Sequence, residues 1–286
     1  MAKVLIVGCG DIGLGLAKIL IAEGHQVSGL KRKRLVNDLP GLKLFLADIT
    51  VKDKLVNLPT DFDQICLILS PDSRDEESYR RVYQRGVENL LNHFTGGSGG
   101  SEGKHKSIPH WIFVSSTSVY GQNAGEWVDE DSPTEPQSFN GKALLQTEQR
   151  VFAAGSNNTI VRFSGIYGPG REGLIKQVQS GSPIQCNPPY YTNRIHRDDC
   201  IGVLAWVLEQ RLAGRPTANI YLASDSNPAP IIEVASWLAD KLDCAAPPEK
   251  QSITLAQNKR CTNQKIIKQG YQFRFSNYRE GYGVRF

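Results

Sequence analysis

A short apolar strand, a glycine-rich turn and a helix follow one another at the start of the chain, and this order constrains the fold more than any other feature. Residues 4–7 favour a buried strand, glycines stand at Gly8, Gly10 and Gly13, and residues 14–25 carry apolar side chains at helical spacing. In the spacing G-x-G-x-x-G, the first glycine permits a tight turn, the second admits a pyrophosphate, and the third lets helix and strand pack closely. We therefore predict a dinucleotide-binding βα unit with phosphates at the helix N-terminus. An ordinary βα turn is the alternative.

Strand-like and helix-like segments alternate through the first half of the chain, which has 286 residues. The expected strands are residues 4–7, 26–30, 42–47, 64–69, 110–115 and 159–163. The expected helices are residues 13–23, 78–94, 141–154, 198–210 and 230–242, with a short helical turn at 52–58. Such alternation produces βαβ units. The sequence therefore predicts an α/β fold of the Rossmann type, a doubly wound parallel sheet with right-handed crossovers.

The composition changes past about residue 165, where Pro, Gly and Asn become frequent. We expect residues 1–165 to form a nucleotide-binding domain that is completed by segments near residues 194–225. Residues 166–286 are expected to form mainly a smaller substrate-binding lobe. Residues 95–103 belong to a Gly/Ser-rich stretch without periodicity, which predicts a mobile surface insertion with no assigned function.

Net charge and the cysteine and histidine content argue against several other classes of protein. The charge of +4 is too small for nucleic-acid binding without a concentrated basic patch. The six cysteines form no C-x-x-C pair and the five histidines have no metal-ligand spacing, so we expect reduced thiols and no metal site. No apolar stretch reaches the roughly 18 residues of a membrane helix, and no cleavage site follows the apolar N-terminus. These features predict a soluble, cytoplasmic protein that binds neither membrane nor nucleic acid.

The residues after the second expected strand bear on the choice between NAD and NADP. NAD-binding folds usually place an acid there, about 20 residues beyond the glycines, to bind the ribose 2′-hydroxyl. This chain has instead four basic residues in succession, Lys31, Arg32, Lys33 and Arg34, which suit a 2′-phosphate. The sequence thus favours NADP(H) over NAD(H), and a solvated basic turn is the alternative.

Further cofactor contacts are expected in the glycine turn and at the carboxyl ends of neighbouring strands. These candidates are Asp11, Ile12, Asp48, Ile49, Leu69, Ser70 and Pro71. The Asp48 carboxylate is placed to reach the adenine amino group, although an aspartate at such a position also caps loops.

Four later motifs, taken with the glycine turn, resemble the extended short-chain dehydrogenase/reductase superfamily. They are VSSTSVYG (residues 114–121), RFSGIYGPG (162–170), RIHRDDC (194–200) and FRFSNYREG (273–281), which follow the family's order along nearly the whole chain. The resemblance implies a Rossmann domain with a small C-terminal substrate domain and the activity of an NAD(P)-dependent epimerase or dehydratase. It also implies a homodimer, as many members form.

The resemblance further implies a catalytic set of Asn, Ser/Thr and a Tyr-x-x-x-Lys pair, which this chain keeps only in part. Ser116 matches the Ser/Thr position and Lys142 the lysine, but Ser138 stands where tyrosine is expected and Tyr83 where asparagine is expected. In the family the lysine lowers the pKa of the tyrosine, which then removes a hydroxyl proton while hydride leaves for the nicotinamide. A serine hydroxyl is too weak an acid for that role.

Each of these positions has two interpretations. Ser116 orients the reacting oxygen or is a strand-end hydroxyl, and Lys142 binds the nicotinamide ribose or is a surface lysine. Tyr83 is the leading candidate for the general base if its helix lines the cleft. A helix tyrosine at such spacing otherwise packs in the core.

Few substrate contacts carry over from the resemblance. Thr117 and Ser118 stand where the family's 4,6-dehydratases have acidic residues, which argues against that elimination. Thr192 replaces an arginine that often binds a nucleotide pyrophosphate. The remaining substrate candidates are Ser138, Tyr167, Arg171 and Arg194.

The sequence as a whole predicts an NADP(H)-dependent oxidoreductase or epimerase for a small hydroxyl- or carbonyl-bearing molecule, with nucleotide sugars as one substrate class. A non-catalytic NADP(H)-binding redox sensor or scaffold is the alternative, because the tyrosine is missing. The complete C-terminal lobe favours an enzyme, since a sensor has less use for a substrate lobe.

Overall fold

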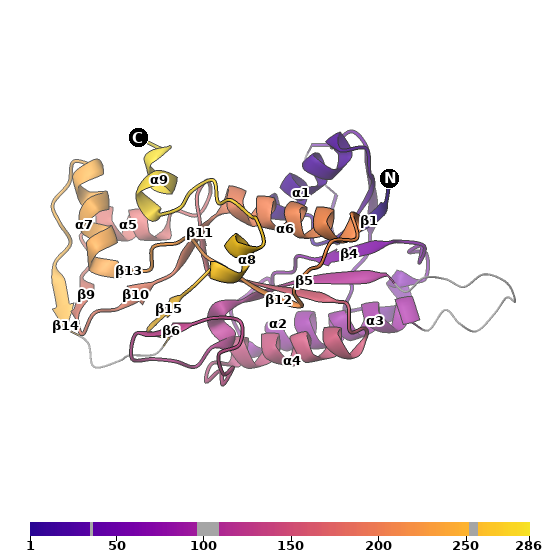
Figure 1. The fold of residues 1–286 in the computed structure, drawn as a ribbon, viewed down its shortest axis with the longest axis horizontal. Helices are drawn as coiled ribbons and strands as arrows, with labels where there is room; N and C mark the ends of the chain where they lie inside the picture. The colour runs from indigo at the N-terminus through magenta and orange to yellow at the C-terminus, as the bar shows by residue number, and fades with distance from the viewer. Residues whose placement is uncertain (35–36, 96–108, 252–256) are drawn as a thin grey trace, which may run out of the picture. The chain divides into compact units, whose positions relative to one another are not determined.

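The computed structural model describes residues 1–34, 37–95, 109–251 and 257–286. They form two compact units, and each unit is assembled from several separate stretches of the chain (Figure 1). Unit 1 comprises Met1–Ser115, Ser138–Val161 and Ile201–Ile220, and unit 2 comprises Ser116–Gln137, Arg162–Cys200 and Tyr221–Phe286. Most of the insertion predicted from the Gly/Ser-rich stretch lies outside the described residues.

A seven-stranded sheet, counted over the described residues, has the order β12-β7-β5-β4-β1-β2-β3. Its strands are β1 (Lys3–Val7), β2 (Gln26–Lys31), β3 (Leu42–Leu46), β4 (Gln64–Leu67), β5 (His110–Ser116), β7 (Thr159–Phe163) and β12 (Ile220–Ala223). Strand β1 pairs in parallel with both β2 and β4. The chain order reverses between β1 and β4, and in such sheets ligands bind at the carboxyl ends of the strands beside the reversal. The predicted Rossmann-type sheet is confirmed, and strand ends differ from the predicted ones by at most two residues.

Helices cover both faces of the sheet. They are α1 (Asp11–Ala22), η1 (Lys52–Leu55), α2 (Glu76–Tyr79), η2 (Arg80–Gly86), α3 (Val87–Thr95), α4 (Phe139–Ala153) and α6 (Arg197–Leu212). In Figure 1, α1 and α6 lie on one face, and α2, α3 and α4 lie on the other. The helix predicted at residues 78–94 is a longer continuous run whose middle part, η2, has π-helical hydrogen bonding. A π turn shifts the phase of the side chains along a helix.

The interior of unit 1 forms around β1, because the apolar run predicted as a strand is buried on both faces. Val4, Leu5 and Ile6 are fully buried. Asn158 ties further segments to this core, since its side chain accepts a hydrogen bond from the Trp111 amide at 3.0 Å and donates one to the Val151 carbonyl at 2.7 Å.

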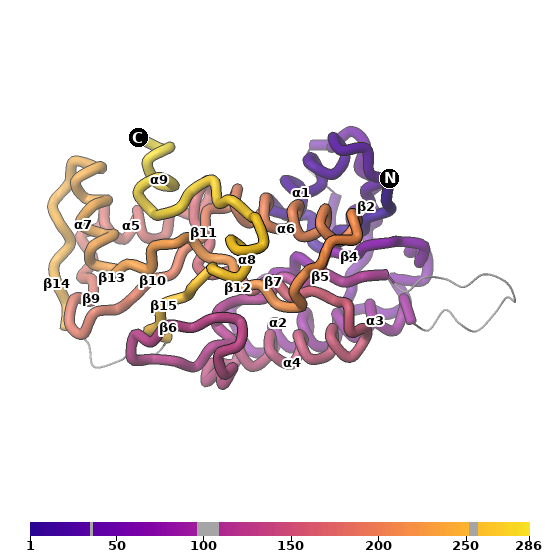
Figure 2. The backbone as a smooth tube through the Cα atoms, viewed as in Figure 1, coloured from indigo at the N-terminus to yellow at the C-terminus, as the bar shows by residue number. Residues whose placement is uncertain are grey.

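Unit 2 is built from short strand pairs and short helices. The pairs join β6 (Glu126–Val128) to β15 (Lys259–Cys261), β8 (Gly165–Tyr167) to β11 (Arg194–His196), β9 (Ile184–Asn187) to β14 (Glu249–Gln251) and β10 (Tyr191–Thr192) to β13 (Ala229–Pro230). The helices are η4 (Thr117–Val119), α5 (Gly173–Gln179), α7 (Ile231–Lys241), α8 (Gln264–Lys268) and α9 (Tyr278–Gly283). Helices α5 and α7 lie side by side (Figure 2). The buried Asp199 holds the C-terminal segment by accepting hydrogen bonds from the amides of Arg274 and Phe275.

None of the helices within the described ranges combines the length and the apolar character that a membrane-spanning helix requires.

The glycine turn generates the first prediction, because its glycines differ in the space around them. A Cβ at Gly13 would lie 2.3 Å from the carbonyl oxygen of Gly8, whereas a Cβ at Gly10 would have no heavy atom within 4 Å. We expect Gly13→Ala to lower the free energy of unfolding by about 1–3 kcal/mol, the usual cost of overpacking. The matched change Gly10→Ala is expected to stay within about 0.5 kcal/mol of the wild type. Urea unfolding followed by circular dichroism measures both. Equal stability of the two variants would contradict this description of the turn.

Candidate functional site

The glycine turn closes tightly around the carboxyl end of β1. Gly8 has a φ of +102°, and a Cβ there would lie 2.0 Å from the carbonyl oxygen of Ile68. Gly13 packs against the Gly8 carbonyl in the same way. Gly10 precedes α1 as its N-cap residue and has no side chain to cap the helix. The turn is therefore crowded at its first and third glycines and open at its second.

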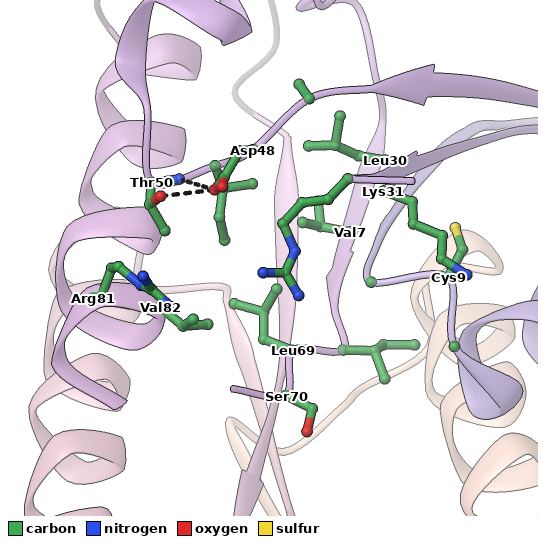
Figure 3. Close-up of a pocket in the computed structure, with 16 residues that line it drawn as sticks. Val7, Cys9, Leu30, Lys31, Asp48, Thr50, Leu69, Ser70, Arg81 and Val82 are labelled. Atoms are coloured by element: carbon green, nitrogen blue, oxygen red, sulfur yellow. Dashed lines mark hydrogen bonds between the residues drawn. The ribbon is translucent and has the colours of Figure 1, made fainter. Parts of the chain in front are cut away.

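A cavity of about 260 Å³ lies beside this turn, at the carboxyl ends of β1, β2 and β4 (Figure 3). Eight of the predicted cofactor residues line it: Gly8, Gly10, Lys31, Arg32, Asp48, Ile49, Leu69 and Ser70. The others do not: Asp11, Ile12, Gly13, Arg34, Pro71 and Lys142. The cavity occupies the place that the strand order indicates, next to the reversal between β1 and β4.

Three basic side chains line the cavity, and an aspartate beyond its lining pairs with the two arginines among them. Lys31 and Arg32 come from the end of β2, and Arg81 comes from η2. The Arg32 guanidinium makes two hydrogen bonds of 2.5 Å to the two carboxylate oxygens of Asp72. Arg81 also lies 3.8 Å from that carboxylate. Arg32 and Asp72 are both about half exposed, and such an ion pair contributes only about 0–1 kcal/mol because water screens it.

Sequence reasoning missed Arg81 and Asp72. Arg81 stands beside Arg80 on a predicted helix, and of the two it is Arg81, in η2, that lines the cavity. The ion pair joins residues 40 positions apart in the chain, which no local pattern indicates.

Asp48 lines the cavity and also caps its own loop. One carboxylate oxygen accepts hydrogen bonds from the Thr50 amide at 2.9 Å and the Thr50 hydroxyl at 2.7 Å (Figure 3). Burial raises the pKa of Asp48, but the Thr50 hydrogen bonds and the charges of Arg32 and Arg81 outweigh burial and hold the pKa below its usual value. Asp48 is therefore a fixed negative charge in the wall. Asp48 therefore caps its loop, as the alternative interpretation predicted, and it also lines the cavity.

Tyr83 is packed behind the cavity rather than exposed in it. Its ring is 6% exposed and lies edge-on to Phe113. Its hydroxyl donates a hydrogen bond of 3.0 Å to the carbonyl of Leu69, a cavity-lining residue. Burial raises the pKa of the phenol well above its ordinary value. This geometry favours the packing interpretation over the general-base hypothesis, and it makes Tyr83 a support for the cavity wall.

At the other catalytic positions of the family, the two serines of this chain cap helices. Ser138 is the N-cap of α4, and its Oγ accepts a hydrogen bond of 3.3 Å from the Gly141 amide. Serine is among the favoured residues at such a position, so Ser138 has a structural role where the family has tyrosine. Lys142 is exposed in the first turns of the same helix. Ser116 caps η4 by accepting a hydrogen bond of 3.2 Å from the Ser118 amide.

The substrate candidates in unit 2 are packed to different degrees. Tyr167 is buried and its hydroxyl donates to the Asn277 carbonyl at 3.5 Å. Arg194 is also buried and donates to the Thr192 hydroxyl. Arg171 is partly exposed, and its amide donates to the Gly168 carbonyl at 3.0 Å.

Comparisons with known proteins are consistent with this architecture. The RmlD substrate binding domain family matches residues 104–185. A solved structure from Methylobacillus flagellatus, provisionally named an NAD-dependent epimerase/dehydratase, is 35% identical and covers 99% of this chain and 97% of its own, with a TM-score of 0.80. Protein YeeZ of Escherichia coli K12 is 29% identical over 226 residues, 75% of this chain and 76% of YeeZ.

A more distant structure shares the fold. The UDP-glucose 4-epimerase of Thermus thermophilus, solved in complex with NAD, is 19% identical and covers 98% of this chain and 96% of its own, with a TM-score of 0.76.

Removing the Tyr83 hydroxyl tests its role as a support. We expect Tyr83→Phe to lower the free energy of unfolding by about 1 kcal/mol, the typical net value of one hydrogen bond. The ring contacts remain, so no larger loss is expected. Tyr79→Phe is the matched control, a partly exposed ring beside Tyr83. It is expected to change stability by less than about 0.5 kcal/mol. Urea unfolding of both variants gives the comparison, and a Tyr83 variant as stable as the control would show that the Leu69 contact contributes nothing.

Proposed function

The chain belongs to the NAD-dependent epimerase/dehydratase family of extended short-chain dehydrogenases/reductases, and on that premise we propose that it is an oxidoreductase or epimerase that prefers NADP(H). Its substrate is a small molecule with a hydroxyl or carbonyl group, with nucleotide sugars as the leading class. One observation supports the cofactor preference. Three basic side chains line the cavity, and β2 contributes no acidic residue to it.

The cavity fits a dinucleotide on the evidence of Gly10. Because a Cβ at Gly10 would enter open space, this glycine is not required by the packing of the protein itself. A ligand that approaches the backbone closely explains it, as a pyrophosphate does at the second glycine of such a turn. The turn would hold the pyrophosphate, and Asp48 would face the adenine. When bound, the nicotinamide ring would accept or donate the hydride of the reaction.

Charge supports NADP(H) over NAD(H). The 2′-phosphate is a dianion that two guanidiniums and an ammonium can bind with charge-assisted hydrogen bonds. Arg32 is held by Asp72, but that exposed pair is worth at most about 1 kcal/mol. Hydrogen bonds to charged groups contribute about 1.5–3 kcal/mol each. A phosphate can therefore displace Asp72 from Arg32, whereas a neutral ribose hydroxyl makes too weak a hydrogen bond with Arg32 to do so.

Among the protein's own groups, Ser116 and Lys142 are assigned to the reaction. Ser116 would hydrogen-bond the reacting oxygen, and Lys142 would position the nicotinamide ribose. We assign Tyr83 to positioning, since its hydroxyl fixes the Leu69 carbonyl of the cavity wall. Tyr83→Phe is then expected to retain turnover.

A redox sensor without turnover is the second candidate function. Ser138 favours it, because the residue that replaces the family's tyrosine serves as a helix cap. The sensor would use the same nucleotide cavity, so cofactor binding does not distinguish the two functions, whereas turnover with nucleotide sugars or small carbonyls does.

The basic side chains generate a direct test of the cofactor preference. We expect NADPH to bind at least about tenfold more tightly than NADH, since one charge-assisted contact corresponds to that factor. Lys31→Ala/Arg32→Ala is expected to remove the preference, and Arg81→Ala to reduce it. The matched control is Arg80→Ala, an exposed neighbour that does not line the cavity. Fluorescence titration with both nucleotides measures each variant.

The complementary change is Asp72→Asn, which releases Arg32. It is expected to tighten NADPH binding by about threefold to fivefold, in keeping with the value of an exposed pair, and to leave NADH unchanged. Asp61→Asn, which breaks an exposed pair with Lys3, serves as its control. Tighter binding of NADH than NADPH by the wild type would contradict the proposed preference.

A further inference from the structure

A second cavity in unit 1 lies at the amino ends of β5, β7 and β12 and shares no residue with the nucleotide cavity. Its volume is about 270 Å³. Every residue that lines it is polar or a glycine, and none is acidic. Five of these residues matter for ligand binding: His110, Asn157, Arg211, Arg215 and Thr217. Such a lining suits a polar ligand that accepts hydrogen bonds.

The guanidinium of Arg211 is bonded within the protein and holds the cavity together. One terminal nitrogen donates to the Oγ1 atoms of Thr159 at 2.6 Å and of Thr217 at 3.4 Å. The other donates to Nδ1 of His110 at 2.7 Å and to the Asn157 carbonyl. These acceptors belong to separate segments at the starts of three strands. Arg211 therefore fixes the wall rather than serving as a contact for a ligand.

The bonds from Arg211 orient two neutral donors in the wall. An arginine can only donate, so Nδ1 of His110 accepts and Nε2 carries the proton of the neutral ring. Burial and the charge of Arg211 both lower the pKa of His110, so the ring is neutral near pH 7. Nε2 has no hydrogen-bond partner among the described residues, and it is not one of the buried atoms, so a ligand can reach it. The Thr217 hydroxyl likewise accepts from Arg211 and has its own hydrogen to donate.

Arg215 supplies the accessible positive charge. Its side chain is exposed, and one terminal nitrogen donates to the neutral Oε1 of Gln210 at 3.1 Å. Within the described ranges, no carboxylate forms an ion pair with it. A planar guanidinium has five N–H groups and binds phosphate through two of them at once. Arg215 thus keeps donors and charge for a ligand.

The other charges near the cavity do not cancel that of Arg215. The C-terminal ends of α4 and α6 lead into the lining, and each carries roughly half a negative charge. Together they amount to about one negative charge, which Arg211 offsets. Asp63 adjoins the site, because its carbonyl accepts from the His110 amide, but its carboxylate accepts from the Lys3 amide at 2.8 Å and does not line the cavity. The charge of Arg215 remains for a ligand.

We propose that this cavity binds the phosphate group of a small phosphate ester or of inorganic phosphate. Arg215 supplies the charge, and His110 Nε2–H and the Thr217 hydroxyl supply neutral donors. A phosphate group has three strong acceptor oxygens, which suit donors from three segments, whereas a carboxylate has two oxygens in one plane. Preference for phosphate over carboxylate is therefore part of the proposal, which is independent of the proposed enzymatic function.

Inorganic phosphate and glycerol 1-phosphate are the probes, and acetate at the same ionic strength is the control. The full-length ¹⁵N-labelled protein is titrated with each, and the imidazole nitrogen signals of His110 are followed by NMR. His110→Gln identifies those signals by their loss. We expect inorganic phosphate to shift the Nε2 signal saturably with a dissociation constant of about 1 mM, and acetate to bind at least about tenfold more weakly. Tighter binding of glycerol 1-phosphate would identify the ester as the ligand, and equal or weaker binding would identify free phosphate.

Two exposed lining residues allow changes that do not put folding at risk. Arg215→Gln is expected to weaken phosphate binding at least about tenfold, since it removes a charge-assisted contact. Arg85→Gln makes the same change at an exposed arginine outside the lining and is expected to bind as the wild type does. Asn157→Asp adds a negative charge to the lining and is expected to weaken binding by about threefold to fivefold. Its control is Asn92→Asp, at an exposed residue of α3.

The nucleotide cavity is the other place where phosphate could bind, and Lys31→Ala/Arg32→Ala separates the two sites. This variant is expected to keep the phosphate-dependent shift of His110, whatever it does to NADPH binding. The proposal fails if phosphate does not shift the wild-type His110 signal saturably or if acetate shifts it equally. It also fails if Arg215→Gln binds phosphate as tightly as Arg85→Gln, or if the shift disappears in Lys31→Ala/Arg32→Ala.

Discussion

The close contact between backbone atoms in the glycine turn is the constraint on which the proposed nucleotide site depends. Gly8 and Gly13 bring the end of β1, the residue after β4 and the start of α1 within van der Waals distance, where no Cβ fits. This contact fixes the direction of α1 and leaves the carboxyl ends of β1, β2 and β4 facing one cavity. Gly10 is then the open position of the turn, and the backbone beside it is accessible to a ligand. Packing thus accounts for Gly8 and Gly13, and the proposed nucleotide binding accounts for Gly10.

The positive charges of the cavity are held in place by an acidic partner. Arg32 and Arg81 carry like charges in the same cavity lining, and Asp72 reduces their repulsion by pairing with both. The pair is exposed and therefore weak, so it holds the arginines without competing strongly with a phosphate. Tyr83 contributes rigidity on the same wall through the Leu69 carbonyl. The cavity is consequently formed and charged by the protein itself.

Much of the fold could be predicted from the sequence, and the reasons for the differences are physical. Apolar runs such as residues 4–7 and 159–163 specify strands because burial requires them, and the glycine spacing specifies the turn. The distant partner of Arg32 and the capping role of Ser138 depend on tertiary contacts or on where a helix begins. The assembly of each unit from separate stretches of the chain also depends on long-range contacts. The two interpretations of Tyr83 could be separated only once the partner of its hydroxyl was known.

The most direct test of the central claim is isothermal titration calorimetry of NADPH against Gly10→Ala, with Gly173→Ala as a control at another glycine whose added Cβ would meet no atom. If Gly10 is the place where the pyrophosphate meets the backbone, the Gly10 variant folds normally and loses NADPH binding, whereas the Gly173 variant binds as the wild type does. Unchanged NADPH affinity in Gly10→Ala would contradict the assignment of this turn as the nucleotide site.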